Sequence, residues 1–304
     1  MTKQRIRHGL LAIAVSGVAV WAGYSAMHPA EAQNLVTVST GQKYSIEDQY
    51  PDLPPAVARA VQGVVAVQRV TGANDTGVIA SGVIFNDSQI LTAGHITGIE
   101  DNPIACSSTY VNVQDYFTPA AGSRLSAVTG ASLYNKTSTY STDVALLTVK
   151  ADANFRQLPN ALLARSKPKA GDSVFLMNYQ PKADGSSRSP DKTESSDPAV
   201  MSAIVLGSGK YGLVVATGGG PSYSRGDSEI TLRKGSSGGA VLDAQGGLVG
   251  LSVSTESLQA NRSAEYIAAN YGVRLAEQQY QVTHVQSLDS QLISELQASQ
   301  ASCS

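Results

Sequence analysis

The chain has 304 residues, of which 42% are hydrophobic and 15% charged, and its formal net charge is −2. This length and apolar content suffice for a large buried core, in one two-part domain or in two small ones. The charge is nearly balanced and no basic stripe is present, which argues against nucleic acid as a partner.

The first 32 residues have the pattern of a secretory signal peptide. Three basic residues precede an apolar stretch over residues 9–27, and an A-x-A cleavage site follows at residues 30–32. The stretch is nearly long enough to span a bilayer, so an uncleaved membrane anchor is the alternative. Its glycines and serines, with the small-residue site, favour cleavage after Ala32. We therefore expect a secreted protein, extracellular or periplasmic, with no stable membrane partner unless the apolar segment stays uncleaved.

Residues 33–60 are polar at first and then contain the sequence YPDLPP. They predict a loosely structured N-terminal extension, which is either a pro-segment or an arm packed on the domain. We assign residues 61–304 to that domain.

Short apolar runs separated by turn residues follow, as is typical of an antiparallel all-β domain. Residues 86–88, with the sequence NDS, predict a hairpin turn, and residues 180–198, rich in Ser, Asp, Lys and Pro, predict a long surface loop. The runs predicted as strands are 63–70, 78–85, 89–92, 144–149, 173–177, 203–207, 212–216, 229–232, 240–242 and 247–253.

After Ser254 the composition shifts toward helix formers. Residues 263–271 are predicted to be helical, and a C-terminal helix is predicted over about 287–298. Leucine or isoleucine at positions 288, 292, 293 and 296 gives this second helix one apolar face. That face suggests that the helix docks on the domain.

The chain has two cysteines, Cys106 and Cys303. In an exported protein two thiols suggest one disulfide, which here would join the C-terminus to the first third of the chain. Its loop is long, so it could stabilise the fold by about 4–5 kcal/mol in the chain-entropy model. Two unpaired thiols are the alternative. Neither cysteine has the spacing of a metal ligand, so no metal site is predicted.

The first candidate for catalytic chemistry is the run GSSGGA at residues 235–240. A serine hydroxyl can act as a nucleophile only when it stands clear of other side chains. The oxyanion that it generates needs backbone N–H donors, which glycines leave unobstructed. Ser237 has Gly235 before it and two glycines after it. A flexible linker is the alternative, but apolar runs on both sides favour a turn held between strands.

A serine nucleophile also needs a base, and only His95 and His284 remain after removal of the signal peptide. His95 follows a predicted strand and two small residues, which would let the imidazole stand at the strand end. For His284 a structural role remains the simpler interpretation. Asp143 directly precedes the buried strand 144–149, where an unpaired carboxylate would be costly, so we expect it to have a partner. It is the candidate that would orient the imidazole.

With these three residues the chain resembles the trypsin-like (chymotrypsin-fold) serine protease family of the bacterial secreted type. Residues 81–95 resemble the family's histidine motif, residues 143–147 its aspartate motif and residues 235–239 its serine motif. The order His, Asp, Ser is the one that this fold uses. The resemblance covers about residues 60–255. It implies an all-β fold of two six-stranded antiparallel β-barrels, with the site between them, completed by a final strand over 280–285 and the C-terminal helix.

By the same resemblance the chain would be a serine endopeptidase that cleaves proteins or peptides through an acyl-enzyme intermediate, without a cofactor. His95, Asp143 and Ser237 would form the triad, and the backbone N–H groups of Gly235 and Ser237 the oxyanion hole. Thr231, six residues before the nucleophile, would lie at the base of the specificity pocket. An uncharged base gives no counter-charge to a substrate Lys or Arg, so cleavage after these residues is disfavoured.

The sequence departs from digestive members of the family in having Ser236, instead of aspartate, before the nucleophile, and in lacking an Ile-Val-Gly-Gly start. A serine cannot pair with a buried ammonium, so we expect an oxyanion hole that needs no particular liberated N-terminus. A rival function is a binding or structural protein that leaves the same site unused. An esterase of the α/β-hydrolase type would need the opposite order, Ser, Asp, His.

Overall fold

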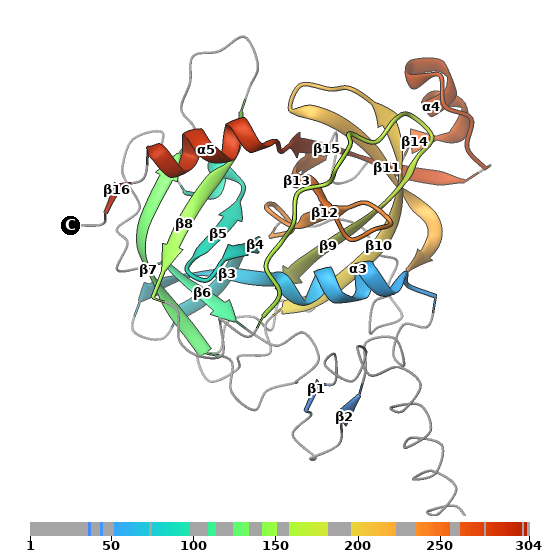
Figure 1. Ribbon diagram of the computed structural model, residues 1–304. Helices are drawn as coiled ribbons and strands as arrows, with labels where there is room; N and C mark the ends of the chain where they lie inside the picture. Colours follow the sequence, from blue (N-terminus) through green and yellow to red (C-terminus); the bar gives the residue numbers. More distant parts are fainter. Residues whose placement is uncertain are drawn as a thin grey trace, which may run out of the picture.

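The computed structural model describes thirteen segments of the chain. Most of the described residues belong to two antiparallel sheets, each closed into a six-stranded barrel (Figure 1). This confirms the predicted all-β class and its two barrels. The segments are 36–37, 43–44, 52–72, 75–97, 109–113, 124–133, 142–150, 158–181, 196–222, 235–255, 262–276, 278–299 and 301–302.

In the first barrel the strands follow the order β7-β6-β3-β4-β5-β8, and pairing of β7 with β8 closes it. The short strand β16 (Ala301–Ser302) adds to the outer edge of β7. At the predicted hairpin turn between β4 and β5, the Ser88 N–H donates to Asn86 Oδ1 at 3.1 Å. Strands β6 and β7 were not predicted. The bounds are β3 Val64–Gly72, β4 Asp75–Asn86, β5 Gln89–Thr92, β6 Thr109–Val113, β7 Arg124–Leu133 and β8 Ala145–Val149.

In the second barrel the strands follow the order β11-β10-β9-β12-β13-β15, and pairing of β11 with β15 closes it. The short strand β14 (Arg262–Ser263) pairs with the N-terminal end of β15. The predicted surface loop over 180–198 is too long, because β9 and β10 continue into both of its ends and pair Pro181 with Ser196. The predicted strand 229–232 lies outside the described residues. The bounds are β9 Ser173–Pro181, β10 Ser196–Gly207, β11 Gly212–Ser222, β12 Ala240–Leu242, β13 Leu248–Thr255 and β15 Gln279–Ser287.

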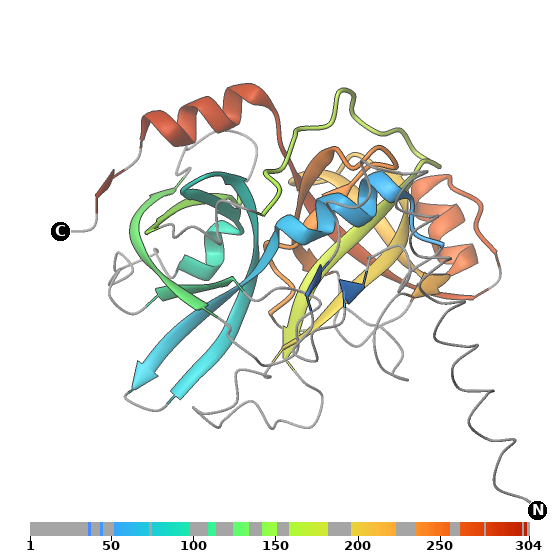
Figure 2. The ribbon, with the colours of Figure 1, turned by 60° about the horizontal axis from the view of Figure 1, so that its bottom comes forward.

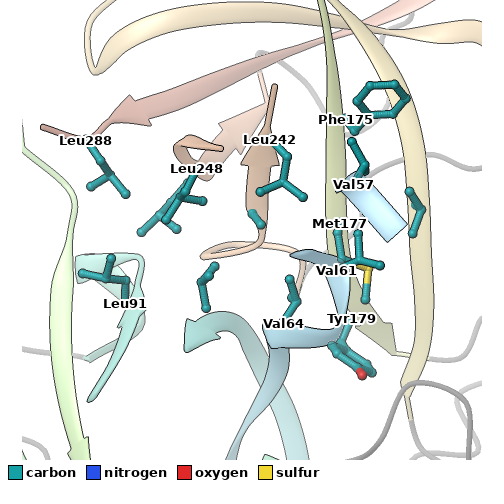
Figure 3. Packing of buried hydrophobic residues seen from close by; sticks show 14 of the residues in the cluster. Val57, Val61, Val64, Leu91, Phe175, Met177, Tyr179, Leu242, Leu248 and Leu288 are labelled. Atoms are coloured by element: carbon teal, nitrogen blue, oxygen red, sulfur yellow. The ribbon is translucent and has the colours of Figure 1, made fainter. Parts of the chain in front are cut away.

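Successive apolar residues occur in strands where both faces of the sheet are buried, as at residues 64–67 of β3. Alternate residues of a strand point to opposite sides of the sheet. In β3, Val65 packs in a core cluster made only of first-barrel residues and their neighbours, whereas Val64 packs in a second cluster shared by the two barrels. Met177 and Leu242 of the second barrel belong to the shared cluster as well (Figure 3). This shared core fixes the two barrels against each other, and with them the residues at their junction.

The helix α3 (Pro55–Ala60) packs on this shared core (Figure 2). Leu53 and Val57 are buried there, and the helix continues through η2 (Val61–Gly63) directly into β3. Residues 53–60 of the predicted N-terminal extension therefore pack on the domain as an arm. Upstream of residue 52 the structure describes β1 (Val36–Thr37) and β2 (Lys43–Tyr44), which pair with each other.

Two helices follow β13, close to where the sequence predicts them. They are α4 (Ala264–Tyr271), beside the second barrel, and α5 (Ser290–Ala298), which lies along β7 and β8 of the first (Figure 1). The helix α5 begins later than predicted because Asp289 is its N-cap and accepts from the Leu292 N–H at 2.9 Å. Its buried residues are Ile293 and Leu296. Within the described segments no helix is both long and apolar enough to cross a membrane.

Candidate active site

The structure brings the three predicted catalytic residues together at the junction of the barrels. His95 lies in the short helix η3 (Gly94–Thr97) after β5, and Asp143 lies just before β8. The register of these strands pairs Thr92 with Ala145, so the end of β5 and the start of β8 are adjacent. Ser237 lies in the turn before β12 of the second barrel.

Hydrogen bonds connect these side chains in one line. His95 Nδ1 lies 2.8 Å from Asp143 Oδ2, and His95 Nε2 lies 3.1 Å from Ser237 Oγ. The ionised carboxylate has only acceptor atoms, so Nδ1 carries the proton and Nε2 is free to accept one from the serine hydroxyl. The imidazole is 48% exposed whereas Asp143 is 13% exposed, so the candidate base is accessible from solvent and the carboxylate beside it is shielded.

Asp143 is itself fixed on two sides. Its Oδ1 accepts from the His95 backbone N–H at 2.7 Å, so both carboxylate oxygens serve the same histidine. Its own N–H donates at 2.8 Å to Oε1 of Gln286, a buried residue of β15 in the second barrel. Gln286 was not among the predicted site residues. It is one of three glutamines in β15, a strand that also contains Thr283 and His284, so no local signal distinguishes it or reveals its partner.

The backbone around Ser237 presents two candidate donors for an oxyanion. Within the described residues, the N–H groups of Gly235 and Ser237 have no hydrogen-bond acceptor. The Ser81 N–H of the first barrel donates to the Ser237 carbonyl at 2.7 Å, which ties the turn to the opposite barrel. Free N–H groups beside a nucleophile are the arrangement that stabilises a tetrahedral oxyanion.

The chain matches the model of a known protein family. The model of the trypsin-like peptidase domain matches residues 80–251, more than half of the chain, and includes all three catalytic candidates. The chain belongs to the trypsin-like peptidase family. Membership implies that its substrates are proteins. No curated protein is similar enough in sequence to match.

Solved structures of proteases are among the similar folds. The active form of the Rv3671c protease from M. tuberculosis is 18% identical, over 81% of this chain and 84% of that one, with a TM-score of 0.41. The serine endoprotease from Yersinia pestis is 24% identical, over 65% of this chain and 56% of that one, with a TM-score of 0.39.

Three of the remaining predicted residues of this trypsin-like peptidase, Thr231, Cys106 and Cys303, lie outside the described residues, so their roles stay predictions. His284 lies on β15, where its ring meets Tyr211 edge-on at 6.3 Å between centroids. It makes no contact with the triad within the described part of the chain. A structural role for His284 fits this position.

Gly238 is the position of the peptidase turn where a side chain is least tolerable. Its φ of +83° is unfavourable for other residues, and a Cβ there would collide with the Ser81 carbonyl and the Thr92 hydroxyl and lie 2.9 Å from the Ala93 nitrogen. We expect Gly238→Ala to lower the free energy of unfolding by about 3 kcal/mol or more, from backbone strain plus overpacking. Urea denaturation measures this loss.

Gly272, at the C-terminus of α4, is the matched control for Gly238. Its φ is +72°, but nothing lies within 4 Å of its Cβ position. Gly272→Ala should therefore cost only the backbone term, about 1–2 kcal/mol. Equal losses in the two variants would show that the close approach of the first barrel to Gly238 does not constrain the turn.

Proposed function

We propose that this trypsin-like peptidase is a secreted serine endopeptidase in which Ser237 is the nucleophile, His95 the base and Asp143 its orienter. The observation that carries the proposal is the hydrogen-bonded line from Asp143 Oδ2 through the imidazole to Ser237 Oγ. Two barrels contribute to this line, so it forms only in the folded protein.

The geometry supports the following proton path. As Ser237 Oγ attacks the substrate carbonyl, His95 Nε2 accepts its proton, and the Asp143 carboxylate stabilises the resulting imidazolium. The N–H groups of Gly235 and Ser237 would donate to the oxyanion. The imidazolium then gives its proton to the leaving amine, which leaves an acyl-enzyme on Ser237. Water, activated by the same base, hydrolyses the ester and restores the hydroxyl.

We further propose export and one disulfide between Cys106 and Cys303. Export is supported by the three basic residues at the N-terminus, the apolar stretch over residues 9–27 and the A-x-A site. An oxidising compartment would then favour the disulfide. The positions of two strands support this pairing, because both pair with β7. Strand β16 ends one residue before Cys303 and pairs Ser302 with Gly130 of β7, and β6 begins three residues after Cys106. An uncleaved anchor remains the alternative to release, and N-terminal sequencing of the exported protein distinguishes the two.

The test of the proposed function combines a serine-directed fluorophosphonate probe with a casein digest. We expect the wild-type protein to be labelled on Ser237, as located by mass spectrometry, and to cleave casein at internal bonds. A protein that uses this fold only for binding would give neither labelling nor cleavage. That double negative would overturn the assignment as an enzyme.

Cleavage specificity gives a separate prediction, which depends on the Thr231 alignment and not on the triad. With an uncharged pocket base, a substrate Lys or Arg would be buried without a counter-charge, so cleavage after these residues should be a minor part of a peptide-library digest. Mass spectrometry of the products gives the residue before each cut. Dominant cleavage after Lys or Arg would refute the pocket assignment while leaving the triad untouched.

A further inference from the structure

We propose that the buried hydroxyl of Ser252, assisted by that of Ser81, holds the oxyanion hole in its working conformation. The inference rests on the proposed function, because it assigns positioning residues for the same reaction. Both serines are almost fully buried, at 3% and 0% exposure, and neither contacts the reacting atoms of the triad directly. They act on the backbone of the turn that carries Ser237.

Ser252 anchors the carbonyl just before the nucleophile. Its Oγ donates to the Ser236 carbonyl at 2.9 Å, and the Gly239 N–H donates to the same oxygen at 3.1 Å. The backbone of Ser252 is clamped to the turn as well. Its N–H donates to the Gly239 carbonyl at 2.9 Å, and its carbonyl accepts from the Gly238 N–H at 2.7 Å. The hydroxyl therefore projects from a rigid strand, β13, onto the turn.

Anchoring this carbonyl fixes the direction of an oxyanion donor. The Ser236 C=O and the Ser237 N–H belong to one planar trans peptide group, so they point in opposite directions. Holding the oxygen against Ser252 therefore aims the N–H at the opposite side. If this peptide rotated, the N–H would leave the oxyanion position and the carbonyl oxygen would repel a developing negative charge.

Ser81 supports the preceding peptide in the same way, from the first barrel. Its Oγ accepts from the Tyr179 N–H at 2.8 Å, so its own proton is directed toward other acceptors. These are the carbonyls of Gly235 and Tyr179, each 3.3 Å away. The contacts are longer than that of Ser252, so we assign Ser252 the larger share.

Hydrogen bonds of neutral groups suit this turn because Ser236, the residue before the nucleophile, has no charge with which to form an ion pair. Ser236 is 6% exposed and uncharged. Gly235 and Gly238 have φ angles of +99° and +83°, which make the turn accessible but do not select one orientation of its peptides. Two buried hydroxyls from strands of different barrels select that orientation, and they do so without any charge.

The test uses the full-length protein and Ser252→Ala. Because the lost bond orients a group that acts in the transition state, we expect kcat to fall about 10- to 100-fold while KM changes less than about twofold. Steady-state kinetics on a peptide cleaved in the library digest measure both constants. The second-order rate of fluorophosphonate labelling should fall with kcat.

Two further variants separate the hydrogen bond from packing. Ser252→Cys keeps a similar shape but offers only a weak donor, so its kcat should fall nearly as far as that of Ser252→Ala. Thr283→Val is the matched control, because Thr283 is also buried in the second barrel and its hydroxyl has no partner within the described residues. It should keep the wild-type kcat.

The outcomes distinguish this inference from the proposed function. If the wild-type protein is neither labelled nor catalytic, the proposed function is wrong. If the wild type is active and a folded Ser252→Ala or Ser252→Cys has the same kcat, the positioning role is overturned. A rise in KM at constant kcat overturns it too, since that would place Ser252 in substrate binding. Should Ser252→Ala unfold, Ser252→Cys alone decides.

Discussion

Replacing Ser237 by alanine should reduce peptide hydrolysis on the order of 10⁴-fold or more. Loss of Oγ removes the atom that would attack the substrate and leaves His95 Nε2 without its partner at 3.1 Å. The backbone hydrogen bonds of the turn do not involve this side chain, among them the one from the Ser81 N–H to the Ser237 carbonyl. The variant should therefore stay folded, with a melting temperature close to that of the wild type.

The measurement is kcat/KM on casein-derived peptides, together with fluorophosphonate labelling. Ser294→Ala serves as a control, because this serine of α5 is exposed and, among the residues that the structure describes, its hydroxyl donates only to the Ser290 carbonyl of its own helix. It should keep full activity. Comparable peptide cleavage by Ser237→Ala and by the wild type would exclude Ser237 as the nucleophile.

Asp143→Asn should have an effect of similar size, on the order of 10⁴-fold in kcat. The amide can keep its oxygen at the Oδ1 position, where it accepts from the His95 N–H. Its NH₂ group then faces Nδ1, which must become an acceptor. The imidazole proton moves to Nε2, so this atom can no longer accept a proton from Ser237. The variant would keep the geometry of the site and lose the correct tautomer.

Fluorophosphonate labelling and peptide hydrolysis should therefore fall together in Asp143→Asn. Asp172→Asn is the matched control, since Asp172 is an exposed turn residue whose carboxylate accepts from the Lys169 N–H. That substitution should not change kcat. Activity of Asp143→Asn within tenfold of the wild type would mean that the carboxylate does not select the tautomer of His95.

The three catalytic candidates could be identified from the sequence because each lies in a short motif with its own physical reason. Gly235 and the glycines after Ser237 indicate an accessible turn, and an aspartate before a buried strand needs a partner. The hairpin at residues 86–88 and the helix over 263–271 were predictable for the same reason, since turn chemistry and helix periodicity are local signals.

The missed elements depend on partners far along the chain. Strands β6 and β7 contain no run of more than two successive apolar residues, so they do not stand out as apolar runs. Neighbouring strands hold them in place, and β7 closes the first barrel by pairing with β8. Strand β10 begins inside a polar stretch because β9 supplies its ladder partners. Pairing between strands overrides local composition, and pairing partners cannot be read from a short window.

The sequence by itself determined the fold class, the order of the motifs and the three residues that could perform acyl transfer. Only the tertiary structure decided which groups support them. Gln286 reaches Asp143 across the junction of the barrels, Ser252 holds the Ser236 carbonyl, and Ser81 lies 154 residues from its partner Gly235. Serines and glutamines are common, and their hydroxyls and amides act only through direction and distance. Those are fixed when the two barrels pack on their shared core.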